Sequence, residues 1–298
     1  MFRKGQNYRF YIAGTIVAEE TSLTRTRGVD TEDASNKDLA PDSSAGELGG
    51  AQPIATYKTQ TFQVEAQGAG AKTLFAAALA LMNSEGGAVG WAETSGTANR
   101  TGSPTYVKAI CNDLTINAPN RQPCTCTAQF TVIPGTPSTP SPGTPAAVTT
   151  NILRGEFLRL FIGTSSATSP IALATNVSLH VSLSLEDATT KDVTSTSGLS
   201  YKSQEATQIT FDITSDCLYG GNSGATNIDT LTEGNIYECA LCDASGNNQW
   251  TQGTTLVSGK AMLTSLGTNA PTGQNITHNG SFTGVGTLHE LEPEQGEE

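Results

Sequence analysis

Charged and aromatic residues are scarce in this chain of 298 residues. Asp, Glu, Lys and Arg make up 15% of it, and Phe, Trp and Tyr only 6%. Long helices and coiled coils are rich in charge, so the composition favours short strands joined by turns. Long apolar runs are also missing. The longest, residues 74–82, is far too short to span a bilayer, and we expect no membrane partner.

Basic residues are the scarcer of the two charged kinds. The chain has 16 Lys and Arg against 28 Asp and Glu, which gives a formal net charge of −12. Binding to nucleic-acid phosphates requires clustered Lys and Arg, so this charge argues against a basic clamp for DNA or RNA. It is compatible with a surface past which DNA slides without being held.

The signatures of enzymes, cofactor sites and metal sites are missing as well. No Gly-x-Ser-x-Gly elbow surrounds any serine. Residues 67–73, Gln-Gly-Ala-Gly-Ala-Lys-Thr, resemble a phosphate-binding loop, but Ala66 and Ala71 stand where that loop needs glycine. Cys239 and Cys242 have the spacing of zinc ligands, yet they lie in an expected strand, where positions three apart face opposite sides. We therefore expect no enzymatic activity, no cofactor and no metal.

Six cysteines in a chain of this length do not make a disulfide scaffold. We expect their thiols to be reduced and partly buried, where they act as small apolar side chains. The six are Cys111, Cys124, Cys126, Cys217, Cys239 and Cys242.

The sequence repeats itself. Arg-Phe-Tyr-Ile at residues 9–12 reappears as Arg-Leu-Phe-Ile at residues 159–162, a shift of 150. Three further matches follow in the same order with shifts of 154, 149 and 152, and small loop insertions account for the drift. They are Glu32-Asp33-Ala34 with Glu186-Asp187-Ala188, Thr61-Phe62 with Thr210-Phe211, and Asn117-Ala118-Pro119 with Asn269-Ala270-Pro271.

A proline-rich segment separates the two copies. Residues 134–145 contain five prolines, which cannot join the interior of a sheet or helix and which favour an extended spacer. We therefore predict a first module at residues 1–133, a linker at 134–150, a second module at 151–288 and an acidic tail at 289–298.

Both copies are predicted to be mostly strand. In residues 176–185 apolar and polar residues alternate, so we expect one face of the strand to be buried and the other to be exposed to solvent. The equivalent residues 23–29 have the same period but a basic face. Ala- and Leu-rich residues 72–82 predict a helix in the first copy, and a weaker helix is expected around residues 228–232 in the second. The expected fold class is mainly β: two tandem β-sandwich or barrel modules, each with one short flanking α-helix.

Several features recur in both copies. They are a strand opening with an aromatic pair, an acidic Glu-Asp-Ala loop followed by Lys-Asp, a Thr-Phe strand, a short helix, and a closing pair of strands with Asn-Ala-Pro and a later Phe. Together they resemble the tail tube proteins of long-tailed, siphovirus-like bacteriophages. The similarity is strongest at residues 185–192 and 263–286, covers nearly all of the second copy and is looser in the first. Most members of that family carry one module per chain, whereas this chain carries two.

The resemblance implies a small β-sandwich or barrel whose copies form six-fold rings, with strands of neighbours joined into one inner barrel. The rings stack into a hollow tail tube, the conduit for ejection of the genome into the host. A long hairpin loop of the family reaches an adjacent ring or subunit. In this sequence that inter-subunit loop matches Glu32, Asp33, Lys37, Asp38, Glu186, Asp187, Lys191 and Asp192.

The repeat and the resemblance together predict that three chains form one pseudo-hexameric ring. The expected partners are other copies of this chain, other tail proteins at the tube ends, and double-stranded DNA that passes through without specific binding. The expected location is the virion tail, after assembly in the cytoplasm of the bacterial host. An acidic or neutral lumen would repel DNA phosphates, whereas the basic residues 25–27 count against such a lumen unless they face a neighbour.

Two other functions stay open. A tail terminator, a hub or the inner tube ring of a contractile system would share the fold and differ only in its assembly. A two-domain β-sandwich adhesin or carbohydrate-binding protein would be a monomer with aromatic residues clustered on one face. The low and dispersed aromatic content disfavours that second alternative.

Overall fold

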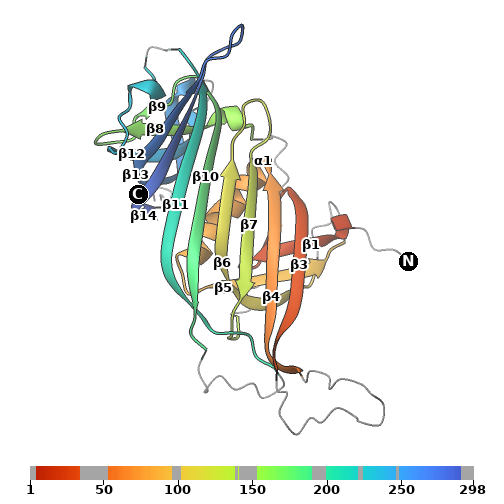
Figure 1. Cartoon of the computed structure of the whole chain (residues 1–298). Helices are drawn as coiled ribbons and strands as arrows, with labels where there is room; N and C mark the ends of the chain where they lie inside the picture. Colours follow the sequence, from red (N-terminus) through yellow and green to blue (C-terminus); the bar gives the residue numbers. More distant parts are fainter. Residues whose placement is uncertain are drawn as a thin grey trace, which may run out of the picture.

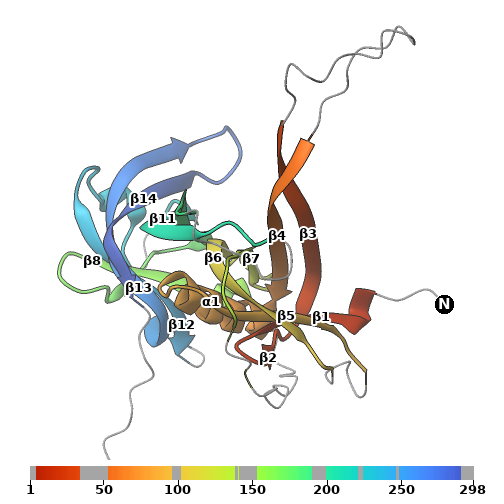
Figure 2. The ribbon, with the colours of Figure 1, turned by 90° about the horizontal axis from the view of Figure 1, so that it is seen from below.

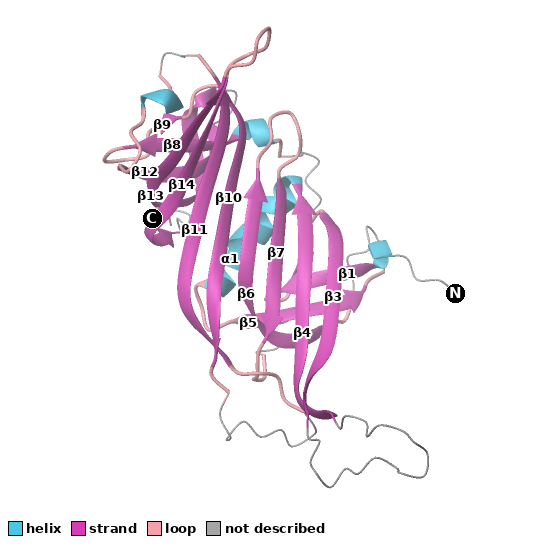
Figure 3. Ribbon diagram, in the orientation of Figure 1, coloured by secondary structure: helices cyan, strands magenta, loops and turns pink. Residues whose placement is uncertain are grey.

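The computed structural model describes residues 5–33, 53–95, 102–137, 140, 153–189, 199–220, 224–245 and 248–289, and they are mainly β, as expected (Figure 3). The first half contains η1 (Gly5–Asn7), β1 (Tyr8–Ile12), β2 (Thr15–Ile16), β3 (Glu20–Asp33), β4 (Pro53–Gln67), α1 (Gly68–Met82), β5 (Gly87–Glu93), β6 (Thr105–Asn117) and β7 (Thr125–Val132). The second half contains η3 (Gly155–Phe157), β8 (Leu158–Gly163), β9 (Ser169–Pro170), β10 (Ala174–Asp187), β11 (Gln204–Leu218), η4 (Ile228–Thr230), β12 (Ile236–Ser245), β13 (Asn248–Asn269) and β14 (Thr277–His289).

Each half has the same order of strands. The order is β2-β1-β5-β6-β7-β4-β3 in the first half and β9-β8-β12-β13-β14-β11-β10 in the second, with every neighbouring pair antiparallel. Three β-bulges also recur at equivalent places. They lie at Glu20/Ser22 and Ala174/Asn176, at Asp30/Thr31 and Ser184/Leu185, and at Cys111/Asp113 and Leu263/Ser265. Since a bulge disrupts pairing at one fixed point, these shared bulges define which residues of the two halves are equivalent.

The strand register revises one of the sequence matches. Phe62 of β4 lies opposite Phe130 of β7, whereas the residue opposite Phe282 of β14 is Ile213 of β11. Because Phe130 and Phe282 are equivalent, Phe62 corresponds to Ile213 and not to Phe211. The Thr-Phe pairs suggested the wrong alignment because Phe62 and Phe211 are both buried core residues.

The two halves are joined edge to edge. β6 pairs with β5 through residues 105–109 and, further along the same edge, with β10 through residues 113–117. On β10 the paired residues are 178–182. We call this pairing the intrachain joint. It turns both halves into one 14-stranded sheet, and Figure 1 shows β10 lying beside β6.

The sheet is curved and has α1 on its outer side. Figure 2 shows β14, β11, β6, β7 and β4 as an arched layer with α1 on the convex side. The helix contacts β4, β6 and β7, and most of the buried apolar residues of both halves form one continuous cluster, with two small clusters apart from it. In that cluster the ring of Phe10 lies 5.2 Å from the rings of both Phe62 and Phe130, measured between centroids. One core therefore supports both halves.

The helix predicted in the first copy is present, whereas the one predicted in the second is not. α1 forms from an Ala- and Leu-rich run, and Oε2 of Glu19 accepts a hydrogen bond from the N–H of Gly70 at 3.1 Å, which places a carboxylate at the helix N-terminus. Around residues 228–232 the chain forms only the 3₁₀ turn η4, because this segment has no such run of strong helix formers. No helix among the described residues is long and apolar enough to cross a membrane.

Replacing Gly70 with alanine should destabilise the protein, although alanine is the better helix former. The added Cβ would lie 2.1 Å from the backbone oxygen of Ala18, which cannot turn aside as a side chain can. We expect the free energy of unfolding in urea to fall by about 1–3 kcal/mol, the usual range for overpacking. Gly5→Ala is the matched control, since no atom lies within 4 Å of its added Cβ. A Gly70→Ala protein as stable as the wild type would contradict this close approach.

Glu20 ties β1 to β3 from a buried position. Its Oε2 accepts hydrogen bonds from the N–H of Phe10 at 3.0 Å and from Nε of Arg9 at 3.2 Å. Burial outweighs both interactions and raises the pKa of Glu20 from 4.5 to about 7. A carboxyl group whose pKa is higher in the folded state stabilises the fold when protonated. Its contribution is therefore complete below pH 4.5 and is lost as the pH rises through 7.

Glu20→Gln should remove this pH dependence, because glutamine keeps a hydrogen-bond acceptor and never becomes charged. Between pH 5 and pH 8 we expect the wild type to lose up to about 3 kcal/mol of stability relative to Glu20→Gln. Urea unfolding of both proteins at the two pH values measures the difference. Parallel stability curves would show that Glu20 has an ordinary pKa.

Candidate functional site

The concave face of the sheet, opposite α1, is polar across its described strands. Along β4, β6, β7, β10, β11 and β14, polar residues on this face alternate with buried apolar residues on the other face. Cross-strand pairing arranges them in rows that continue across the intrachain joint. We define the polar face as Thr61, Gln63, Glu65, Asp113, Thr115, Asn117, Thr125, Thr127, Gln129, Thr131, Ser178, His180, Ser182, Thr210, Asp212, Thr214, Asp216, Asn279, Ser281 and Thr283.

The polar face carries negative charge and contains no Lys or Arg. Its carboxylates belong to Glu65, Asp113, Asp212 and Asp216. Its one titratable base is His180, whose Nε2 lies 3.0 Å from Oδ2 of Asp113 on the other side of the intrachain joint. Such a face repels phosphate groups and lacks the cations that would hold them.

The two arginines of β3 lie on the other face of the sheet. Arg25 is opposite Phe62, a core residue, and its guanidinium carbon lies 3.8 Å from the ring centroid of Trp91. Its Nη2 also donates to Oε1 of the buried Gln60 at 3.2 Å. Arg27 is two residues further along the strand and therefore shares this face. Neither arginine adds positive charge to the polar face.

Two long strands, β3 and β13, have an open edge at opposite ends of the strand series β3-β4-β7-β6-β10-β11-β14-β13, and the short strands β2 and β9 end the sheet elsewhere. β3 pairs with β4 along one edge, and no described strand pairs with its other edge. β13 pairs with β14 as far as Asn269, but on its other edge the pairing with β12 stops at Met262. β3 is equivalent to β10, and residues 265–269 of β13 are equivalent to the part of β6 that β10 occupies. The two open edges are therefore the two sides of the intrachain joint, each without its partner.

Half of the predicted inter-subunit loop residues can be placed. Four lie exposed at the ends of β3 and β10: Glu32, Asp33, Glu186 and Asp187. The other four lie outside the described residues: Lys37, Asp38, Lys191 and Asp192. Their contact with an adjacent subunit or ring stays a prediction.

The ends of β3 and β10, from which the two predicted inter-subunit loops start, lie side by side. Nζ of Lys202 is 3.2 Å from Oδ2 of Asp30 and 3.6 Å from Oδ2 of Asp187, so one ammonium group bridges β3 and β10. The hydroxyl of Tyr201 adds a hydrogen bond to Oε1 of Gln60 at 3.2 Å. The hydrogen bond to Asp30 raises the pKa of Lys202. No pattern in the sequence predicts the role of Lys202, because Asp30, one of its two partners, is far away in the sequence.

The patterns considered for cofactors and metals have structural uses. Lys72, in the segment that resembles a phosphate-binding loop, forms an ion pair with Asp243 of the second half. All six cysteines are free and buried, and burial raises the thiol pKa to about 12 for Cys111, Cys124 and Cys239. In the part of the chain that the structure describes, no group of three or more His, Cys, Asp and Glu side chains could hold a metal ion.

This chain is similar to chains of solved particles. No family model matches the sequence, and no curated protein matches it. Fourteen chains of solved structures match it. One belongs to the tail of an empty gene transfer agent particle with C6 symmetry; the TM-score is 0.35 at 12% identity, over 47% of this chain and 98% of the other. Another belongs to the virion of a native gene transfer agent particle; the TM-score is 0.32 at 11% identity, again over 47% of this chain and 98% of the other.

The six thiols should be unreactive in the folded protein. Each is buried and free, so a thiol reagent such as Ellman's reagent can reach it only after unfolding. We expect no rapid reaction under native conditions and reaction of all six in urea. Rapid reaction of any one thiol in the native protein would contradict its buried position.

Proposed function

We propose that this chain is a structural protein of a phage-like tail, the subunit of rings that stack into the tail tube. The observation that carries the proposal is the pair of open edges on β3 and β13, which repeat the two sides of the intrachain joint at the two ends of one strand series. An unpaired strand edge recruits another strand. A second copy can therefore extend the sheet in the way that the two halves already do.

A head-to-tail joint of this kind gives a closed ring when the rotation from one copy to the next is a whole fraction of a full turn. The curvature of the sheet supports closure over an extended filament (Figure 2). The resemblance to tail tube proteins implies six modules per ring, and each chain supplies two, so the proposed ring has three chains. Each chain then contributes β3, β4, β7, β6, β10, β11, β14 and β13, in that order, to a continuous inner barrel.

The polar face would line the lumen of this ring, because it lies on the concave side of the sheet. Its carboxylates would repel the phosphates of double-stranded DNA, and its hydroxyl and amide groups offer no cationic clamp. DNA would then slide through the tube during ejection into the host without specific binding. The role proposed is structural and not enzymatic, with no cofactor.

The proposed partners follow from the two ends of the ring. β3, β4, β10 and β11 all reach the same end of the molecule, where Figure 1 shows them converging. We place the contact with an adjacent ring there, through the exposed Glu32, Asp33, Glu186 and Asp187. Other tail proteins would bind at the ends of the tube. The protein would be assembled in the bacterial cytoplasm and end in the virion tail.

Electron microscopy and native mass spectrometry of the purified chain test this function. We expect rings of three times the 30.9 kDa of one chain, and stacks of these rings at higher concentration. Single rings that never stack would overturn the tube and favour a terminator or hub. A monomer at every concentration would overturn the ring itself and favour a two-domain β-sandwich that acts alone.

A further inference from the structure

We propose that the joint between chains pairs residues 24–28 of β3 antiparallel with residues 265–269 of β13 from a second copy, with Thr26 opposite Gly267. This interchain joint rests on the ring proposed above and names the surfaces that close it. It follows from the register of the intrachain joint, from apolar side chains left exposed at both open edges, and from the charge that separates β3 from β10.

The intrachain joint fixes the register. Ser178 lies opposite Asn117, His180 opposite Thr115 and Ser182 opposite Asp113. The shared bulges show that β10 is equivalent to β3 at a shift of 154 residues, and β6 to β13 at a shift of 152.

Carrying this register to the open edges gives three opposed pairs between two chains. They are Thr24 with Asn269, Thr26 with Gly267, and Gly28 with Ser265. All six of these residues are exposed in the single chain, so no rearrangement of the sheet is needed to expose them.

Apolar side chains are exposed where the interchain joint would cover them. Val29 of β3 is 49% exposed and Val285 of β14 is 37% exposed. Their equivalents at the intrachain joint are Leu183 and Ile133, which are only 7% exposed and line one cavity of about 990 Å³. The second half therefore lacks, at its open edge, the cover that the first half receives from β10 and β11.

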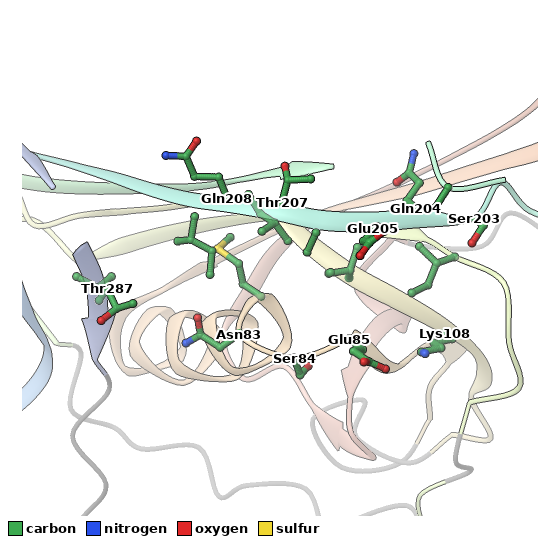
Figure 4. Close-up of a pocket in the computed structure, with 18 of the residues that line it drawn as sticks. Asn83, Ser84, Glu85, Lys108, Ser203, Gln204, Glu205, Thr207, Gln208 and Thr287 are labelled. Carbon is green, nitrogen blue, oxygen red and sulfur yellow. The ribbon is translucent and has the colours of Figure 1, made fainter. Parts of the chain in front are cut away.

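Figure 4 shows what covers that cavity at the intrachain joint. Thr207 and Gln208 of β11 lie across from Asn83 and Ser84 at the end of α1. β4 is equivalent to β11, so the β3–β4 hairpin of a second chain would provide the same cover over the second half. Ile236 of β12, also exposed, stands beside the open edge because it pairs with Met262, where the pairing of β12 with β13 stops.

The two joints are not interchangeable. On its core face β10 presents Leu179 and Val181, and both are buried. β3 has Arg25 and Arg27 at the equivalent places. Placing β3 on β6 would force these guanidinium groups into an apolar core at a cost of several kcal/mol. Where the first half has α1, the described part of the second half has only the 3₁₀ turn η4, so β13 does not offer β3 the same apolar core.

A disulfide test reports this register directly. The variant Thr26→Cys with Gly267→Cys should form disulfides between chains under mild oxidation, because the two positions lie directly opposite each other. A Cβ at position 267 meets only the backbone oxygen of Asn279, at 3.8 Å, so the cysteine fits. The six native cysteines are buried and stay out of the reaction. We expect dimers and trimers, and nothing larger, on non-reducing gels.

Two matched variants control the geometry. In Thr61→Cys with Gly267→Cys, the first thiol lies on the same face as that of Thr26→Cys but on β4, one strand further from the second chain. Neighbouring strands are about 4.8 Å apart, so this pair should not link chains. His180→Cys with Thr115→Cys is the intrachain equivalent and should form a disulfide within one chain.

The possible outcomes distinguish failure of the interchain joint from failure of the three-chain ring. Three-chain rings in which Thr61→Cys links to Gly267→Cys while Thr26→Cys does not would overturn this register and leave the ring intact. Efficient linkage through Thr26→Cys that continues past the trimer would support the joint and overturn the three-chain ring. Failure of both pairs in a protein that stays monomeric would overturn both proposals.

Discussion

The fold depends on the backbone hydrogen bonds at the edges of its strands. An unpaired edge exposes N–H and C=O groups that must bond to water or to another strand. β6 meets this requirement twice along one edge, because β5 occupies its first part and β10 its second. Without the pairing of β10 there would be two separate sheets; with it there is one sheet, one core and one concave face.

The alternation of side chains along the same strands gives the two faces opposite properties. Residues that point toward α1 are apolar and buried, and their neighbours point to the concave side and are polar. Because the period is two, a slip of one residue would exchange the two faces. The recurring bulges hold the register in place, and the same rows of Ser, Thr, Asn and Gln therefore continue from one half into the other.

Local patterns in the sequence predicted individual elements well and their assembly poorly. The alternation at residues 176–185 and the Ala- and Leu-rich run at 72–82 predicted β10 and α1, because each pattern lies within its own element. The helix expected at residues 228–232 is absent, since it rested on the repeat and not on helix-forming residues. The pairing of His180 with Asp113 could not be predicted, because two strands 67 residues apart meet only once the sheet has formed. The polar face is likewise a property of six strands together.

The two halves differ at β3 and β10, and the physical reason is that the intrachain joint and the proposed interchain joint form under different conditions. β10 is covalently attached to its partner, so it meets β6 at a high effective concentration and can present an apolar face from the start. β3 would meet its partner only in another chain, and until then its edge is exposed to water. A long apolar edge would aggregate, and charge on edge strands prevents this. Arg25 and Arg27 stand where β10 has Leu179 and Val181, and Arg25 stays half-buried against Trp91. In the proposed ring, the same two side chains would keep this edge soluble and exclude it from the apolar surface beside β6, so solubility before assembly and order within the ring would have one cause.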